Sequence, residues 1–130
     1  MSTRGADDAA CVLVVDDEED IREALREAIE LTGCRAITAA NGAVALEKLR
    51  TWRPCLVILD LRMPVMTGLE MLAAMQKDPE LAALRVVVST SAPGRAPAGI
   101  PVLPKPIDIE KLFGWVRRAC TCDRATASSA

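Results

Sequence analysis

Carboxylates follow two short apolar runs of the sequence. Asp16 and Asp17 come directly after the run at 11–15, and Asp60 comes directly after the run at 55–59. If two parallel strands end side by side, the three carboxylates meet at one edge of the sheet, where like charges raise one another's pKa. A hard divalent cation relieves that repulsion, and ligation by oxygen atoms suits Mg²⁺. The pattern therefore indicates a magnesium site.

A hydroxyl and a lysine follow later apolar runs. Thr90 follows the run at 85–89, although the flanking Ser89 and Ser91 leave the register open, and Lys105 comes just after the run at 101–103. A lysine at the same edge can neutralise a carboxylate cluster or hold a phosphoryl oxygen. Acids, a hydroxyl and a lysine at four strand ends therefore indicate a site suited to a phosphoryl group.

Several of these residues also have a purely structural interpretation. Two acids after a strand can cap the following helix and interact with its dipole, and a lysine is usually solvated at the surface. These alternatives stay open for Asp16, Asp17 and Lys105 taken singly. Capping does not explain a lone carboxylate at the end of an entirely apolar strand, as at Asp60.

Strand and helix patterns alternate along the chain and would position these side chains. Strands are expected at 11–15, 35–39, 55–59, 85–89 and 101–103. Helices are expected after the first acids as far as Gly33, after the Asn41-Gly42 cap in a unit that Pro54 ends, from 67 or 68 through Lys77, and from Asp108 onward. The apolar positions expected in the core of those helices are Ile21, Ala24, Leu25, Ala28, Ile29, Ala45, Leu46, Leu49, Leu69, Leu72, Met75, Leu112, Phe113 and Val116. The alternation predicts a parallel, doubly wound α/β sheet, which binds ligands at the carboxyl ends of its strands.

Four short motifs carry a resemblance to a known family. They are Val14-Val-Asp-Asp17, Leu59-Asp-Leu-Arg-Met-Pro64, Met66-Thr-Gly68 and Leu103-Pro-Lys-Pro106. In this order and spacing, the chain at 10–120 resembles the receiver domain of two-component response regulators. The resemblance implies a flavodoxin-like fold, in which five parallel strands lie in the order 2-1-3-4-5.

The resemblance also implies roles for individual residues. Asp60 would be the phosphoacceptor; Asp17, Asp60 and the backbone carbonyl of Arg62 would bind Mg²⁺, and Asp16 would act largely through water. Thr90 and Lys105 would contact phosphoryl oxygens, and the Lys105–Pro106 peptide bond would be cis. A histidine kinase or a histidine phosphotransfer protein would be the donor, and this chain, which has no His, is not that donor by the usual route.

The chain departs from the family between the fourth and fifth strands. Receivers normally have a helix there, but the segment 91–104 is short and rich in Pro and Gly. Because Pro costs about 3 kcal/mol in a helix interior, we expect a loop or at most a single turn. Val102 stands where many receivers carry an aromatic residue. Ser91 and Arg62 would alter the access of water to the phosphoryl group.

The composition argues against several other classes of protein. A formal charge of −2 and three aromatic residues offer little to nucleic acid or to an anionic membrane. The apolar runs are too short to span a bilayer and the first ten residues lack a signal-peptide core, so a cytoplasmic protein is expected. The five cysteines are expected to be reduced thiols, with metal binding or oxidation at Cys120 and Cys122 as the alternative.

We therefore expect one receiver domain at 10–121 between flexible ends at 1–9 and 122–130. It would be a phosphorylation switch that docks to a separate, unidentified protein, and not a conventional enzyme beyond its own phosphoryl transfer and dephosphorylation. The alternative is an adaptor that binds a partner regardless of phosphorylation, which the short 91–104 segment favours. A flavin or dinucleotide carrier is not expected, because a Gly-rich phosphate loop is missing after the first strand.

Overall fold

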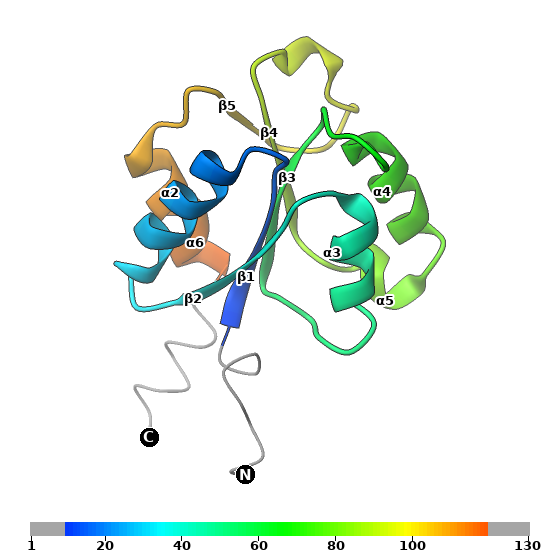
Figure 1. Ribbon diagram of the computed structural model, residues 1–130, viewed down its shortest axis with the longest axis horizontal. Helices are drawn as coiled ribbons and strands as arrows, with labels where there is room; N and C mark the ends of the chain where they lie inside the picture. Colours follow the sequence, from blue (N-terminus) through cyan, green and yellow to red (C-terminus); the bar gives the residue numbers. More distant parts are fainter. Residues whose placement is uncertain (1–9, 120–130) are drawn as a thin grey trace, which may run out of the picture.

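The computed structural model describes residues 10–119, in which a five-stranded parallel sheet lies between two layers of helices (Figure 1). The strands are β1 (Ala10–Val15), β2 (Arg35–Ala39), β3 (Leu56–Asp60), β4 (Val86–Thr90) and β5 (Val102–Pro104). The helices are α2 (Glu19–Glu30), α3 (Gly42–Lys48), α4 (Gly68–Gln76), α5 (Pro79–Ala82) and α6 (Ile109–Ala119). Figure 1 shows α2 and α6 on one face of the sheet and α3, α4 and α5 on the other. The strand order β2-β1-β3-β4-β5 confirms the predicted flavodoxin-like fold.

The two strands that carry the acids are neighbours at the centre of the sheet. Every residue of β3 is buried, as expected for a parallel strand that is covered on both faces. The pairing puts Val15 opposite Leu59 and Asp60 opposite Ser89. Asp16 therefore leaves β1 at the same edge of the sheet at which Asp60 ends β3.

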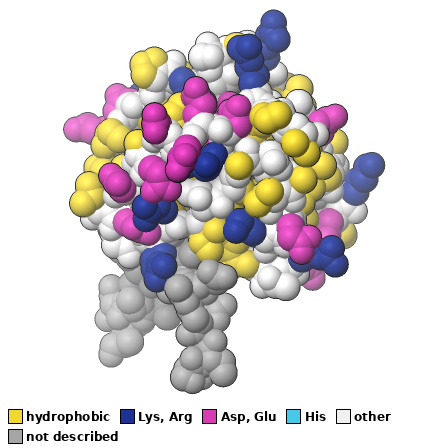
Figure 2. All heavy atoms as spheres, in the orientation of Figure 1, with side chains coloured by type: hydrophobic (Ala, Val, Ile, Leu, Met, Phe, Trp, Pro, Cys, Tyr) yellow, Lys and Arg dark blue, Asp and Glu magenta, His cyan; other side chains and the backbone are white. Residues whose placement is uncertain are grey.

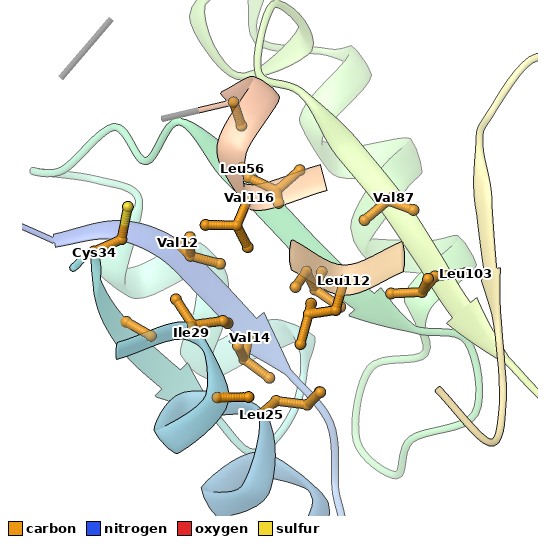
Figure 3. Close-up of a cluster of buried hydrophobic side chains, with 14 residues drawn as sticks. Val12, Val14, Leu25, Ile29, Cys34, Leu56, Val87, Leu103, Leu112 and Val116 are labelled. Atoms are coloured by element: carbon orange, nitrogen blue, oxygen red, sulfur yellow. The ribbon is translucent and has the colours of Figure 1, made fainter. Parts of the chain in front are cut away.

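Two clusters of buried side chains join the sheet to its helices. Figure 3 shows the first cluster, in which α2 and α6 meet one face of the sheet; its labelled members are Val12, Val14, Leu25, Ile29, Cys34, Leu56, Val87, Leu103, Leu112 and Val116. The second cluster, on the other face, includes Leu49, Met71 and Met75. Since burial of one large aliphatic side chain is worth about 1.5–3 kcal/mol, these clusters hold both helix layers in place.

Two of the predicted core positions are wrong. Leu69 is 48% exposed and Ala24 is exposed. In α4 the buried positions are Gly68, Met71, Leu72 and Met75, a single helical stripe that leaves Leu69 beside it. In α2 the buried stripe is Leu25, Ala28 and Ile29, with Ala24 at its margin.

Side-chain caps determine where three of the helices begin. The side chain of Asn41 accepts a hydrogen bond from the backbone N of Val44, and Thr67 forms a capping box with Glu70. Asp108 Oδ1 accepts hydrogen bonds from the first turn of α6, 2.8 Å from the backbone N of Glu110. The predicted helix starts near 42, at 67–68 and at Asp108 are therefore confirmed.

The segment between β4 and β5, every residue of which is described, contains no α-helix. Pro93–Arg95 form one 3₁₀ turn, so the predicted loss of this helix is confirmed. The short helix α5, which precedes β4, was not predicted. Asp78 caps it and Pro79 occupies its first turn, but four residues are too few for hydrophobic periodicity to reveal.

Some predictions concern residues outside the described range 10–119. These are the flexible ends at 1–9 and 122–130 and the alternative role of Cys120 and Cys122. Within the range, Cys34 is a free buried thiol and Cys55 is partly exposed. Among the described helices, none combines the length and the apolar character that a membrane span needs.

Candidate functional site

Asp16 is the most tightly held acid of the site and is only 1% exposed. Its backbone N donates to Ala39 O at 3.1 Å, and its Oδ1 accepts from the backbone N of Glu18 at 2.9 Å. Its carbonyl oxygen accepts from Arg22 Nη1 at 2.8 Å, and its Oδ2 accepts from Lys105 Nζ at 2.9 Å. The next residue, Asp17, is exposed. The two adjacent acids therefore differ in burial, which the strand pattern alone does not indicate.

Asp60 ends β3 and is 6% exposed. Directly after it the chain turns back and begins α4 at Gly68, whose backbone N donates to Leu61 O at 3.0 Å. A Cβ atom at Gly68 would lie 2.8 Å from the Cα atom of Leu61 and would also collide with the carbonyl group of Asp60. Only glycine fits there, so the Met66-Thr-Gly68 motif allows α4 to start against the strand end that carries Asp60.

Lys105 reaches the acids from β5. Its backbone N donates to Thr90 O at 2.9 Å, and the Lys105–Pro106 peptide bond is cis, as predicted. Its Nζ atom lies 2.9 Å from Asp16 Oδ2 and 3.5 Å from Asp60 Oδ1. One ammonium group therefore neutralises acids that end two different strands.

A cleft of about 460 Å³ opens at this edge of the sheet. Its lining residues are Asp17, Glu18, Asp60, Arg62, Thr90, Ser91 and Lys105. Thr90 is 2% exposed, and its Oγ1 accepts a hydrogen bond from the backbone N of Ala92 at 3.0 Å, which leaves the hydroxyl hydrogen available as a donor. The structure thus brings Asp17, Asp60, Thr90 and Lys105 to one cleft.

Arg62 and Asp16 contribute to the site in ways of their own. The backbone N of Arg62 lies 3.4 Å from Asp60 Oδ1, and its side chain is exposed at the cleft. Asp16 is not part of the lining, and its Oδ2 atom accepts a hydrogen bond from Lys105.

Reasoning from the sequence assigned no role in the site to two residues at this edge. Glu18 lines the cleft, and the signal for it was the third consecutive acid after β1. Ser89 is 1% exposed, and its hydroxyl makes no hydrogen bond to any described residue. Since Ser89 is paired in register with Asp60, this unpartnered hydroxyl lies on the strand beside the acid.

The three carboxylates fit a divalent cation. One oxygen atom each of Asp16, Asp17 and Asp60 lies within 4.8 Å of the other two. Mg²⁺ binds oxygen ligands at about 2.0–2.1 Å and keeps several waters, so a site with few carboxylates and one exposed member suits it. Lys105 supplies only part of the positive charge that three acids need.

Burial and crowding set the electrostatics of the site. Burial raises the pKa of Asp60 and the charge of Asp16 raises it further, more than Lys105 and the backbone N of Arg62 lower it. Burial alone would lower the pKa of Lys105, but its hydrogen bond to Asp16 and the charges of Asp16 and Asp60 outweigh burial and raise it. Lys105 is therefore protonated at neutral pH. The ionised form of Asp60, in contrast, lowers the free energy of unfolding.

Comparison with known proteins agrees with this geometry. A family model described as the response regulator receiver domain matches residues 12–117. The chain belongs to the response regulator receiver family. This receiver domain has β1 and β3 as neighbours and its acids at their carboxyl ends, so the predicted resemblance is confirmed.

Individual relatives are moderately similar to this receiver domain. The response regulator MprA of Mycolicibacterium vanbaalenii is 31% identical over 127 residues, which cover 92% of this chain and 55% of MprA. The chain thus spans about half the length of the curated relatives that it matches. The chemotaxis response regulator CheY4 of Vibrio cholerae is 30% identical, with a TM-score of 0.76 over 85% of this chain and 98% of CheY4. The response regulator TrrA of Thermotoga maritima, solved in complex with Mg²⁺-BeF, is 30% identical, with a TM-score of 0.74 over 85% of this chain and 98% of TrrA.

Proposed function

We propose that this receiver domain is a phosphorylation switch in which Asp60 accepts a phosphoryl group beside Mg²⁺. The observation that carries the proposal is the position of Lys105 Nζ, 2.9 Å from Asp16 and 3.5 Å from Asp60 at the wall of a cleft. A buried acid with a cation on one side and a buried hydroxyl nearby has the parts that phosphoryl transfer requires.

The transfer itself needs little covalent chemistry from the protein. A carboxylate oxygen of Asp60 attacks phosphorus in line, a new O–P bond forms, and the bond from phosphorus to the donor nitrogen breaks with its electron pair. The product is an acyl phosphate. In a separate hydrolysis step, water attacks phosphorus and loses a proton to the solvent, the bond from the Asp60 oxygen to phosphorus breaks with its electron pair, and inorganic phosphate leaves with Asp60 restored as a carboxylate.

Two neighbours of Asp60 would bind the transferred group. Lys105 places a charged ammonium at the cleft, where it offsets the negative charge of the phosphoryl oxygens. Thr90 has a hydroxyl hydrogen to donate to another of these oxygens. Both groups come from strand ends, so they are held in place before the phosphoryl group arrives.

The residues that would hold Mg²⁺ are Asp17, Asp60 and the backbone carbonyl of Arg62, with Asp16 acting largely through water. When bound, the ion supplies positive charge to the phosphoryl oxygens. The spacing of the three carboxylates and the complex of TrrA with Mg²⁺-BeF support this choice of ion.

The proposed partners follow from the same chemistry. The donor is a histidine kinase or a histidine phosphotransfer protein, and the output is docking to a separate protein in the cytoplasm. The rival function is an adaptor that binds its partner regardless of phosphorylation. The absence of a helix between β4 and β5 favours the rival, whereas the set of Asp60, Thr90 and Lys105 favours the switch.

The intact mass of the protein tests the proposal. The wild-type chain is incubated with acetyl phosphate, with Mg²⁺ or with EDTA, and its mass is then measured. We expect the gain of one phosphoryl group that requires Mg²⁺, and no gain in the Asp60→Asn variant. A wild-type chain that stays unmodified by acetyl phosphate and by a competent histidine kinase would favour the adaptor.

A further inference from the structure

Arg22 ties the loop that carries the two N-terminal acids to helix α2. The Arg22 side chain is half-buried, and its Nη1 donates to the carbonyl oxygen of Asp16 at 2.8 Å. Its backbone N donates to Glu18 O at 3.0 Å. This backbone bond is the first of helix α2, so the contact that is specific to arginine is the one from the guanidinium to the carbonyl oxygen of Asp16.

These contacts bear on the direction in which Asp17 projects. The carbonyl of Asp16 and the backbone N of Asp17 belong to one planar peptide group. A hydrogen bond that fixes this carbonyl also fixes the rotation of the peptide plane. The direction in which the backbone enters residue 17 is then fixed as well. Asp17 is exposed, so packing does little to orient it, and the backbone must do so.

The capping of α2 makes Arg22 more important to this loop. The N-cap residue Glu18 makes no side-chain hydrogen bond to the helix. Hydrogen bonds of Asp16 hold the loop: its carboxylate accepts from Glu18 and Lys105, and its carbonyl oxygen accepts from Arg22. Among these three bonds, the one to Arg22 comes from a side chain of α2. Loss of the Arg22 guanidinium would remove the side-chain hydrogen bond that fixes the orientation of this peptide group.

We infer that Arg22 is a positioning residue for metal binding, which holds the Asp16–Asp17 peptide so that Asp17 meets the cation in the geometry that Mg²⁺ demands. The inference rests on the proposed function, because it takes Asp17 as a ligand. Mg²⁺ needs nearly octahedral ligation, so a small error in the direction of one carboxylate weakens binding. Residues that orient metal ligands typically change affinity by about 10- to 100-fold when they are replaced.

A purely electrostatic role for Arg22 makes the opposite prediction. A positive guanidinium near the acids repels Mg²⁺, so removal of its charge would tighten binding, and lysine, which keeps the charge, would leave binding unchanged. A positioning role predicts weaker binding in both cases. Lysine carries its ammonium group on a shorter side chain than arginine, and glutamine is shorter still, so neither places a donor where Nη1 of Arg22 lies.

The test is the Mg²⁺ affinity of the whole chain, measured by titration calorimetry without a phosphodonor. The variants are Arg22→Lys and Arg22→Gln. The matched control is Arg26→Gln, one turn further along α2, whose side chain binds Glu23 and Glu30 instead of the loop. We expect both Arg22 variants to bind Mg²⁺ about tenfold more weakly, and the control to stay within about twofold of the wild type.

Thermal unfolding in EDTA separates positioning from simple support of the fold. If Arg22 only stabilised α2, its variants would lose thermal stability in EDTA but would keep the affinity for Mg²⁺, which overturns the inference. Tighter binding by Arg22→Gln also overturns it. A wild-type chain that binds no Mg²⁺ would overturn the proposed metal site together with the role of Arg22, whereas normal affinity in the Arg22 variants overturns that role alone.

Discussion

The ammonium group of Lys105 binds Asp16 more closely than it approaches Asp60, at 2.9 Å against 3.5 Å. The side chains of Lys105 and Asp16 are 18% and 2% exposed, so the pair is largely removed from water. Lys105 thus joins the end of β5 to the end of β1 across the sheet. Its place at the cleft also leaves it near the oxygens of any group bound to Asp60.

Replacement of Lys105 by Met should reveal the structural role of this pair. The variant leaves the buried carboxylate of Asp16 without its cation, and removal of one partner of a buried pair costs about 3 kcal/mol. We therefore expect Lys105→Met to lower the free energy of unfolding in urea by about that amount. Lys111→Met, which removes an exposed lysine of α6, is the control and should change stability little.

The pH dependence provides a second check on the same variant. The pKa of Lys105 in the folded protein is raised above its ordinary value of 10.5, so its contribution is fully present below pH 10.5 and is lost as the pH rises through the higher folded pKa. The difference between wild type and Lys105→Met should thus be constant from pH 7 to pH 10 and shrink above that. An equally stable variant would contradict a structural role for the pair.

Asp60→Asn should stabilise the protein at neutral pH when Mg²⁺ is absent. The pKa of Asp60 is raised above 3.8 by burial and by Asp16, so its ionised form is less stable in the folded protein than in the unfolded chain. The cost is absent below pH 3.8 and is fully present above the raised folded pKa. Urea unfolding in EDTA should show a more stable variant at pH 7 and no difference near pH 3.

Added Mg²⁺ should stabilise the wild type more than Asp60→Asn. At ten times its dissociation constant, a ligand that binds only the folded state stabilises it by about 1.4 kcal/mol. The wild type should gain this stability and Asp60→Asn should gain much less. If Asp60→Asn is instead less stable than the wild type in EDTA, the folded protein stabilises the ionised Asp60 side chain, and the expected gain in stability is contradicted.

Gly68→Ala should disturb the chain around Asp60. The new Cβ atom would collide with the backbone of Asp60 and Leu61, which cannot move without shifting the end of β3. Overpacking of this kind costs about 1–3 kcal/mol. Gly94→Ala is the matched control, since a Cβ atom there meets no atom within 4 Å and the residue has an ordinary φ. Equal unfolding free energies for the two variants would contradict the close approach of α4 to β3.

Ser89→Ala should leave the fold intact and raise its stability. The hydroxyl of Ser89 is buried and has no hydrogen-bond partner among the described residues, and an unsatisfied buried polar group costs about 1–3 kcal/mol. We expect a gain of about 1 kcal/mol in urea unfolding. Ser91→Ala, at the exposed neighbour, should be neutral. A loss of stability in Ser89→Ala would show that water or another group binds this hydroxyl in solution.

The sheet was predictable from the sequence because its signals are local. Apolar β-rich runs mark the strands, and an acid at the end of the buried run 55–59 marks the carboxyl edge. The loss of a helix between β4 and β5 was predictable for the same reason, since Pro acts through its own backbone.

Other features were not predictable because they depend on distances between elements. The rotation of α4, which buries Met71 and exposes Leu69, depends on the contact of Gly68 with β3. The preference of Lys105 for Asp16 depends on a difference of less than one ångström between two strand ends. The strand pattern alone does not distinguish Asp16 from Asp17, and the structure shows that Asp16 is buried and bound whereas Asp17 is exposed.

The most direct measurement is the position of the phosphoryl group in the wild-type chain. After reaction with acetyl phosphate and Mg²⁺, borohydride reduces an aspartyl phosphate to homoserine, and peptide mass spectrometry locates the altered residue. We predict homoserine at position 60 alone, and none when EDTA replaces Mg²⁺. Homoserine at position 16 or 17, or a chain that carries none after treatment with a competent kinase, would contradict Asp60 as the phosphoacceptor.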